Sequence, residues 1–251
     1  MKSATAYFRL NWIRNSSYIW DFVAQNVNSV VNASIGLGLI ILLKQNNALI
    51  TANNYQFILV VYIMYAIAVG FFYQIFMGYL LMPEYVISGD IDVLLLRPEG
   101  LAKTLIKKDF NLQELLRIVV GYGILFTLIP STFKNVIVAL LVPISGAMIM
   151  GGLAGILSSL TFKYPSTGAV MLFVFPISNM GQYPMDAYPK WIRLILTIIP
   201  IAFISYYPSS YLVKYSNASA LIGSIMVGIA MFALSVVVIQ RMAKSYCGPN
   251  T

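Results

Sequence analysis

The sequence predicts an all-α integral membrane protein, built as a single transmembrane domain over residues 1–251 with six membrane-spanning helices. Hydrophobic residues make up 59% of the 251 residues and charged residues only 10%, so water is a poor solvent for most of its surface. The mean hydropathy is +0.81, and the apolar residues form long runs. Several runs reach the ~20 residues that cross a bilayer core.

The charge and residue inventory excludes several functions. The net charge is +8, but the basic residues lie between apolar runs, which fits membrane orientation and argues against nucleic-acid binding. Cys247 is the single cysteine and histidine is absent, so we predict no disulfide, no metal site and no catalytic constellation. The sequence holds no Gly-x-x-x-x-Gly-Lys-Ser/Thr phosphate loop. Any ATP that drives this protein would therefore bind a separate polypeptide.

Residues 1–20 mix aromatic and basic side chains before the first apolar run. Ala4, Phe8 and Trp12 recur at helical spacing beside Arg9 and Arg14, which predicts a helix lying on the membrane surface. An aromatic belt that simply precedes the first span is the alternative.

The first two predicted spans, residues 22–43 and 57–81, carry the polar and aromatic faces of interest. In the first span Gln25, Ser29 and Asn32 share one helical face, with Asn28 beside them. Such side chains need partners in lipid, either on other helices or in a wet substrate path. The second span carries an aromatic stripe that either packs or lines a path for an amphipathic cargo. The predicted pathway residues are Gln25, Asn28, Ser29, Asn32, Tyr62, Tyr65 and Tyr73.

Residues 82–111 form a charged, turn-rich loop between two apolar runs. Gly89 is placed to end the preceding helix in a left-handed conformation, and Asp90 to cap a short helix over 91–96. Pro98 then restricts Arg97 to extended geometry. The short helix has an apolar face of Ile91, Leu94 and Leu95, which suits insertion into a groove of another protein. Packing on the membrane surface is the alternative.

The remaining apolar runs predict four more spans, over residues 112–129, 136–160, 167–182 and 218–240. Asn111 with Glu114 forms a capping pair for the first of these. Ala147, Gly151 and Gly155 let a neighbouring helix approach the next one closely. Between the last two, residues 183–214 are divided by prolines into pieces too short for an ordinary span. We expect re-entrant half-helices there.

The distribution of basic residues predicts the orientation. With six spans, 11 of the 16 Lys and Arg residues lie on the side of the termini and 5 on the other side. The positive-inside rule therefore places both termini and the 82–111 loop in the cytoplasm of a cell-membrane protein.

The string Ile87-Ser88-Gly89-Asp90-Ile91-Asp92-Val93-Leu94-Leu95-Leu96-Arg97-Pro98 resembles the loop after the second span in a bacterial group of type-2 ABC exporter permeases. The series Tyr183-Pro184, Tyr188-Pro189, Pro200 and Pro208 resembles the broken segment before that group's last helix. The resemblance covers nearly the whole chain, although Glu99 stands where an apolar residue is more usual.

This resemblance implies a cytoplasmic coupling helix seated on a nucleotide-binding ATPase subunit, which holds ATP and Mg. It implies a working unit of two permeases, identical or related, with two ATPases. By family position Gly89, Asp90, Asp92, Arg97 and Pro98 would form the coupling element. The apolar face of Ile91, Leu94 and Leu95 completes the predicted coupling residues.

We therefore expect the transmembrane subunit of an ATP-driven exporter that moves an amphipathic or lipid-like compound across the lipid membrane. Two other functions fit the same residues. One is a structural or regulatory membrane subunit that recruits a cytoplasmic partner, and the other is an ion-coupled secondary transporter. The secondary transporter lacks obvious residues for a proton or sodium relay, because Asp21, Glu114 and Arg117 fall at predicted span ends.

Overall fold

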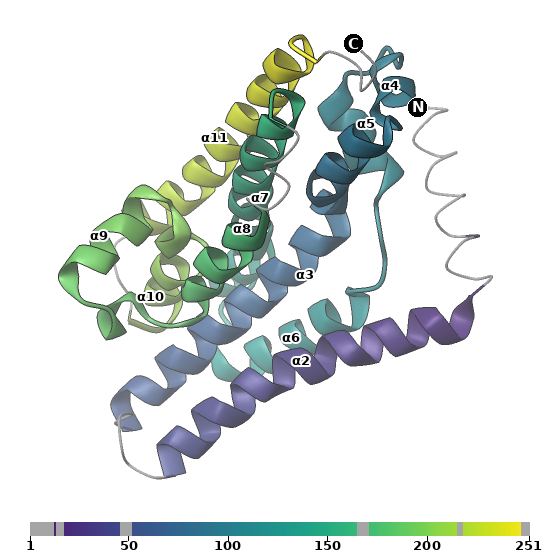
Figure 1. Cartoon of the computed structure of the whole chain (residues 1–251). Helices are drawn as coiled ribbons and strands as arrows, with labels where there is room; N and C mark the ends of the chain where they lie inside the picture. Colours follow the sequence, from purple (N-terminus) through teal and green to yellow (C-terminus); the bar gives the residue numbers. More distant parts are fainter. Residues whose placement is uncertain (1–12, 14–17, 46–51, 165–170, 215–217, 247–251) are drawn as a thin grey trace.

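The computed structural model describes residue 13 and residues 18–45, 52–164, 171–214 and 218–246. Every regular element in these ranges is a helix (Figure 1). The longer helices are α2 (Ile19–Gln45), α3 (Ala52–Ser88), α6 (Leu115–Leu128), α7 (Phe133–Ser159) and α11 (Ala218–Ala243). The shorter ones are α4 (Ile91–Leu95), α5 (Leu101–Lys108), α8 (Met171–Asn179), α9 (Lys190–Ile198) and α10 (Tyr206–Lys214), with single 3-10 turns η1 (Leu160–Phe162), η3 (Met180–Gln182), η4 (Met185–Ala187) and η5 (Ile201–Phe203).

Four of the described helices, α2, α3, α7 and α11, are long and apolar enough to cross a membrane. The predicted spans 22–43, 57–81 and 218–240 fall within α2, α3 and α11, and 136–160 falls within α7 and η1. A bent pair of short helices brings the number to five if the pair counts as one span.

The predicted number of six spans is not confirmed. In place of the span 112–129 the structure has α6, whose 14 residues reach only about 21 Å at 1.5 Å per residue. In place of the span 167–182 it has the nine-residue α8, with Pro176 inside it, followed by η3. Helix α6 is therefore shorter than the predicted span, and residues 167–170 of the other predicted span lie outside the described residues.

The region 183–214 is broken, as its prolines predict. Helix α9 and the helical segment Ile201–Val213 meet at an angle of 79°, and Pro200 lies at the break. A proline has no N–H to donate and its ring blocks a continuing helix. A bent span and a re-entrant loop share this geometry.

Helix α7 lies between α3 and α11 and forms the centre of the packing. A Cβ at Gly151 would lie 2.4 Å from the Phe76 ring, and one at Gly155 would lie 2.8 Å from Tyr79. Gly151 and Gly155 of the predicted small-residue series thus pack against aromatic side chains of α3 in the same chain. Gly152 faces α11, where an added Cβ would lie 2.7 Å from the carbonyl oxygen of Met231.

Gly152→Val is expected to destabilise the protein strongly. Its side chain would meet the backbone of α11, which cannot rotate away, so the two helices must separate, at a cost of about 1–3 kcal/mol. Thermal unfolding in detergent should show a lowered Tm. Gly38→Val is the matched control, because a Cβ at Gly38 in α2 meets nothing within 4 Å. An equal Tm for the two variants would contradict the packing.

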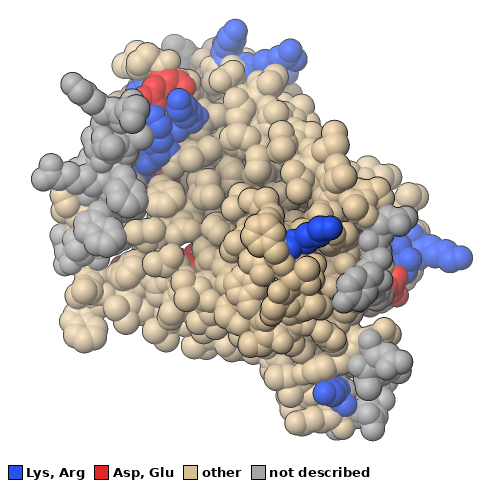
Figure 2. Space-filling model, turned by 180° about the vertical axis from the view of Figure 1, so that it is seen from behind, with Lys and Arg blue, Asp and Glu red and all other residues tan. Residues whose placement is uncertain are grey.

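The short helices α4 and α5 and the C-terminal end of α11 lie together at one end of the molecule (Figure 1). Figure 2 shows a broad, mostly uncharged surface below the Lys and Arg side chains at this end, with a basic side chain near the middle of the view. This distribution suits a protein embedded in lipid. The predicted surface helix over residues 1–20 falls almost wholly outside the described residues.

Candidate functional site

In the loop between α3 and α6, one glycine precedes α4 and a second precedes α5. Gly89 has a φ of 81°, which confirms the predicted left-handed residue after α3. Gly100 has the same φ and starts α5, a turn that the sequence reasoning missed. Helix α4 is therefore a separate unit between two left-handed turns.

The two capping predictions were wrong. Asp90 makes no side-chain hydrogen bond to the α4 backbone; instead its Oδ2 accepts a bond from the Ser88 hydroxyl at 3.0 Å. Glu114 stands at the N-cap of α6 without capping it. The Asn111 side chain accepts a bond from the Gln113 N–H at 2.8 Å, which stabilises a turn ahead of the helix. At both helix starts the predicted capping residue, Asp90 or Asn111, instead makes a hydrogen bond within the preceding turn.

The apolar face of α4 docks onto its own chain, which corrects the prediction that this face needs another protein. Ile91 is 0% and Leu94 4% exposed, and both belong to the core formed with Met82, Val86 and Leu101. Leu95 is half-buried.

The surface that α4 presents outward consists of other residues. Val93 is 63% and Leu96 86% exposed, and Ile87 at the end of α3 is also exposed. Asp90, Asp92, Arg97 and Pro98 are exposed around them. We call Ile87, Val93 and Leu96, with this polar rim, the α4 surface. Exposed apolar residues within a polar rim are typical of a contact surface.

The α4–α5 unit is fastened to α3 by polar contacts. The Tyr85 hydroxyl donates to Asp109 Oδ1 at 2.9 Å, and the Lys108 ammonium lies 3.5 Å from the centre of the Tyr85 ring. Glu99 forms an ion pair with Lys107. At Gly78 an added Cβ would lie 2.4 Å from the Leu105 carbonyl oxygen, so α3 and α5 touch backbone to backbone. Helix α5 is therefore held against α3 both by polar contacts and by close backbone packing.

The chain beyond α11 also reaches this unit. The ring of Tyr246 packs edge-on against Phe162 at 5.7 Å between centroids. Burial and the neighbouring Asp92 carboxylate raise the pKa of the Tyr246 hydroxyl. Tyr246 thus lies between the end of α7 and the start of α4.

A cavity of about 350 Å³ lies farther along α3. Its walls come from α2, α3, α6 and the α8–η3 segment. The lining residues are Asn32, Ala33, Tyr62, Tyr65, Ala66, Val69, Tyr73, Arg117, Asn179 and Gln182. Phenol, amide and guanidinium groups dominate this wall, so the cavity is polar although helices of a membrane protein surround it.

The tyrosines of the cavity are held by hydrogen bonds and stacking. The Tyr62 hydroxyl donates to the Ala33 carbonyl of α2 at 2.6 Å, and the Tyr65 hydroxyl donates to Asn179 Oδ1 at 2.8 Å. The Tyr73 ring stacks on Phe175 with 6.0 Å between centroids. These contacts tie α3 to α2 on one side and to α8 on the other.

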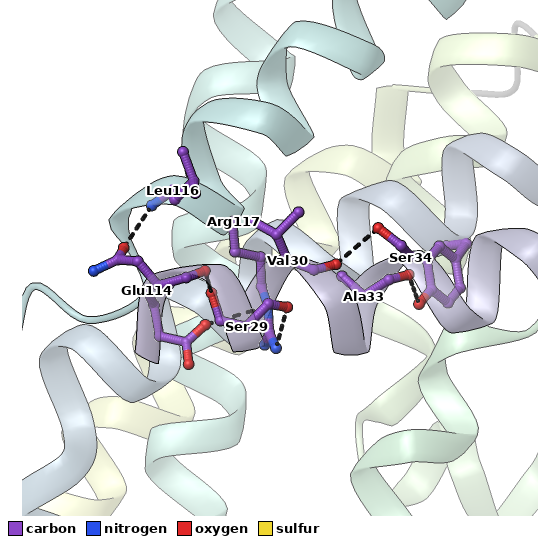
Figure 3. Close-up of polar contacts among 9 residues, drawn as sticks. Ser29, Val30, Ala33, Ser34, Glu114, Leu116 and Arg117 are labelled. Atoms are coloured by element: carbon purple, nitrogen blue, oxygen red, sulfur yellow. Dashed lines mark hydrogen bonds and ion pairs between the residues drawn. The ribbon is translucent and has the colours of Figure 1, made fainter. Parts of the chain in front are cut away.

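Arg117 joins α6 to α2 beside the cavity (Figure 3). Its Nε and Nη2 donate to the Ser29 carbonyl at 3.1 and 3.0 Å, and Nε lies 3.2 Å from Glu114 Oε2. The Leu116 N–H donates to Asn26 Oδ1 at 3.0 Å. The Arg117 and Glu114 side chains are only 12% and 17% exposed, so this pair is desolvated and depends on these partners.

The structure divides the predicted pathway residues into two groups. Asn32, Tyr62, Tyr65 and Tyr73 line the cavity. Gln25 instead donates to Asp21 at 2.9 Å, Ser29 is buried with its hydroxyl donating to the Asn26 carbonyl at 2.8 Å, and Asn28 is exposed and does not line the cavity. The first half of the polar face therefore serves contacts within and between helices.

Sequence reasoning missed three polar residues of the cavity, Arg117, Asn179 and Gln182. Arg117 falls at a predicted span end, and Asn179 and Gln182 fall at the end of the predicted span 167–182. An amide pair three residues apart at such a point is a signal that could have suggested a helix turned toward a polar cavity.

Comparison with known sequence families gives one finding. Residues 30–249 match the family described as ABC-2 family transporter protein. Neither the comparison with curated proteins nor that with solved structures gives a match. The matched range contains the α4–α5 unit, every residue that lines the cavity and the broken segment before α11. The chain therefore belongs to the ABC-2 transporter family, as a multi-pass membrane permease.

Proposed function

We propose that this chain is the transmembrane subunit of an ABC exporter, driven by a separate nucleotide-binding ATPase that docks on the α4 surface. The observation that carries this proposal is the course of α3. One helix of 37 residues supplies Tyr62, Tyr65 and Tyr73 to the cavity and ends at Ser88 beside α4. Family membership supports an ATP-binding partner in general.

The mechanism follows from this connection. The ATPase binds ATP and Mg, and its closure pushes on Val93 and Leu96. Because α4 and α5 are fastened to α3 at Gly78 and Tyr85, the push moves α3 as a unit. The α3 tyrosines that line the cavity, Tyr62, Tyr65 and Tyr73, then shift relative to α2 and α8. This movement closes the cavity on one side of the membrane and opens it on the other. The α4 surface and both termini lie in the cytoplasm of a cell-membrane protein.

The cargo is amphipathic or lipid-like. A cavity with tyrosine rings, amides and one guanidinium offers apolar faces and hydrogen-bond partners together, which is the usual chemistry of a small-molecule site. A second permease, a copy or a relative, completes the working unit and shares the lipid membrane.

Purification in gentle detergent followed by reconstitution tests this function. We expect a P-loop ATPase to co-purify, and vesicles containing both proteins to move a fluorescent phospholipid analogue only when ATP is supplied. Asp90→Ala combined with Arg97→Ala should leave ATP hydrolysis in place and abolish transport. ATP-independent transport driven by an ion gradient would instead identify a secondary transporter, and co-purification without any transport would identify a regulatory subunit.

A further inference from the structure

We propose that the cavity selects cargo with an anionic head group, through Arg117, and that the apolar chain of the cargo begins in a small adjoining crevice of about 40 Å³ between α2, α3 and α6. This inference rests on the proposed function in treating the cavity as a cargo site. It adds the charge of the cargo and its orientation.

The charge of the cavity is the first argument. Arg117 is the only charged residue that lines it within the described part of the chain. Its Nε and Nη2 each donate one hydrogen bond to the Ser29 carbonyl, and Nε also forms an ion pair with Glu114. A guanidinium has five N–H donors, so further donors remain for a ligand. Phosphate and carboxylate groups match this planar set of donors, whereas a cation would be repelled.

The position of Glu114 is the second argument. Its carboxylate contacts Arg117 at Nε but is absent from the lining of the cavity. It therefore contacts the guanidinium (Figure 3) and weakens its field without forming part of the cavity wall. Tyr65, Asn179 and Gln182 complete the wall with uncharged polar groups.

The apolar crevice is the third argument. It shares Ala33, Tyr62, Ala66 and Arg117 with the cavity, and the rest of its lining is apolar apart from Ser34: Val30, Leu37, Ile63, Val120, Gly121 and Ile124. The Tyr62 ring occupies the place of a side chain at Gly36, where an added Cβ would lie 2.3 Å from the hydroxyl oxygen. Tyr62 and Arg117 thus lie between the polar cavity and the apolar crevice. An amphipathic ion could place its charged head in the cavity and the start of its apolar chain in the crevice.

Binding to the purified full-length permease in maltoside detergent tests the proposal without ATP or a partner. The probes are n-dodecyl phosphate and n-dodecyltrimethylammonium, which share a chain and differ in charge, and the readout is ligand-dependent thermal stabilisation. We expect the phosphate to bind at least about tenfold more tightly than the ammonium, equivalent to about 1.4 kcal/mol. Arg117→Gln should abolish the preference and Arg117→Lys should retain part of it.

Two further variants separate ligand binding from a structural role. Glu114→Gln removes the competing carboxylate and should tighten phosphate binding, whereas a purely structural ion pair would predict weaker binding. Lys134→Gln, at the exposed start of α7, removes the same charge elsewhere and should leave the binding of both probes unchanged.

Equal affinity for the two probes, or a preference that survives Arg117→Gln, would overturn the inference. ATP-driven transport without charge preference would refute only this inference, while charge-selective binding without ATP-driven transport would refute only the proposed function.

Discussion

Leu96→Glu is expected to abolish ATP-driven transport while the permease still folds and inserts. Leu96 is 86% exposed, so a glutamate there disturbs no contact within the chain. In the assembled transporter the same carboxylate would be buried against the ATPase without a partner, and burying an unpaired charge is costly. We expect association with the ATPase to weaken by at least about tenfold, or 1.4 kcal/mol. Co-purification and transport in vesicles measure the two effects.

Two control variants make this result specific. Phe133→Glu places the same charge at a residue that is 78% exposed at the start of α7, far along the chain from α4, and should leave association unchanged. Leu94→Ala, in the core under α4, should lower the Tm because it opens a cavity worth about 2–5 kcal/mol. Normal co-purification of Leu96→Glu would show that the α4 surface is not the docking site.

Asn32→Trp should block transport without changing assembly or ATP binding. Asn32 lines the cavity opposite the tyrosines of α3, so an indole there would occupy space that the cargo needs. Transport should fall by about tenfold or more, which corresponds to at least 1.4 kcal/mol in the rate-limiting barrier. Uptake of the fluorescent phospholipid analogue into vesicles measures the rate.

Asn28→Trp is the matched control, one helical turn earlier on α2. Asn28 is exposed and does not line the cavity, so the same substitution should leave transport close to that of the unchanged protein. If both variants transported equally well, cargo would not pass through this cavity. If both lost transport, the whole polar face of α2 would belong to the path, as the sequence alone predicted.

The two neighbouring asparagines show how far the sequence could predict the candidate site. Helical periodicity places Asn28, Ser29 and Asn32 on adjacent parts of α2, because it depends only on 3.6 residues per turn. It cannot tell which of them meets another helix. That depends on the position of α6. Its Arg117 side chain donates a hydrogen bond to the Ser29 carbonyl, and its Leu116 N–H donates one to the Asn26 side chain. These contacts fill the first half of the face and leave Asn32 beside the cavity.

Composition and apolar run lengths by themselves determined that this is a helical membrane protein, and a glycine-bounded string of residues determined where α4 begins. These features depend on local geometry and on transfer from water to lipid. Only the tertiary structure decided that Ile91 and Leu94 face the chain's own core, that Leu96 faces outward, and that Arg117, Asn179 and Tyr65 meet across one cavity. Each of these depends on contacts between segments far apart in the sequence, which no single run of residues contains.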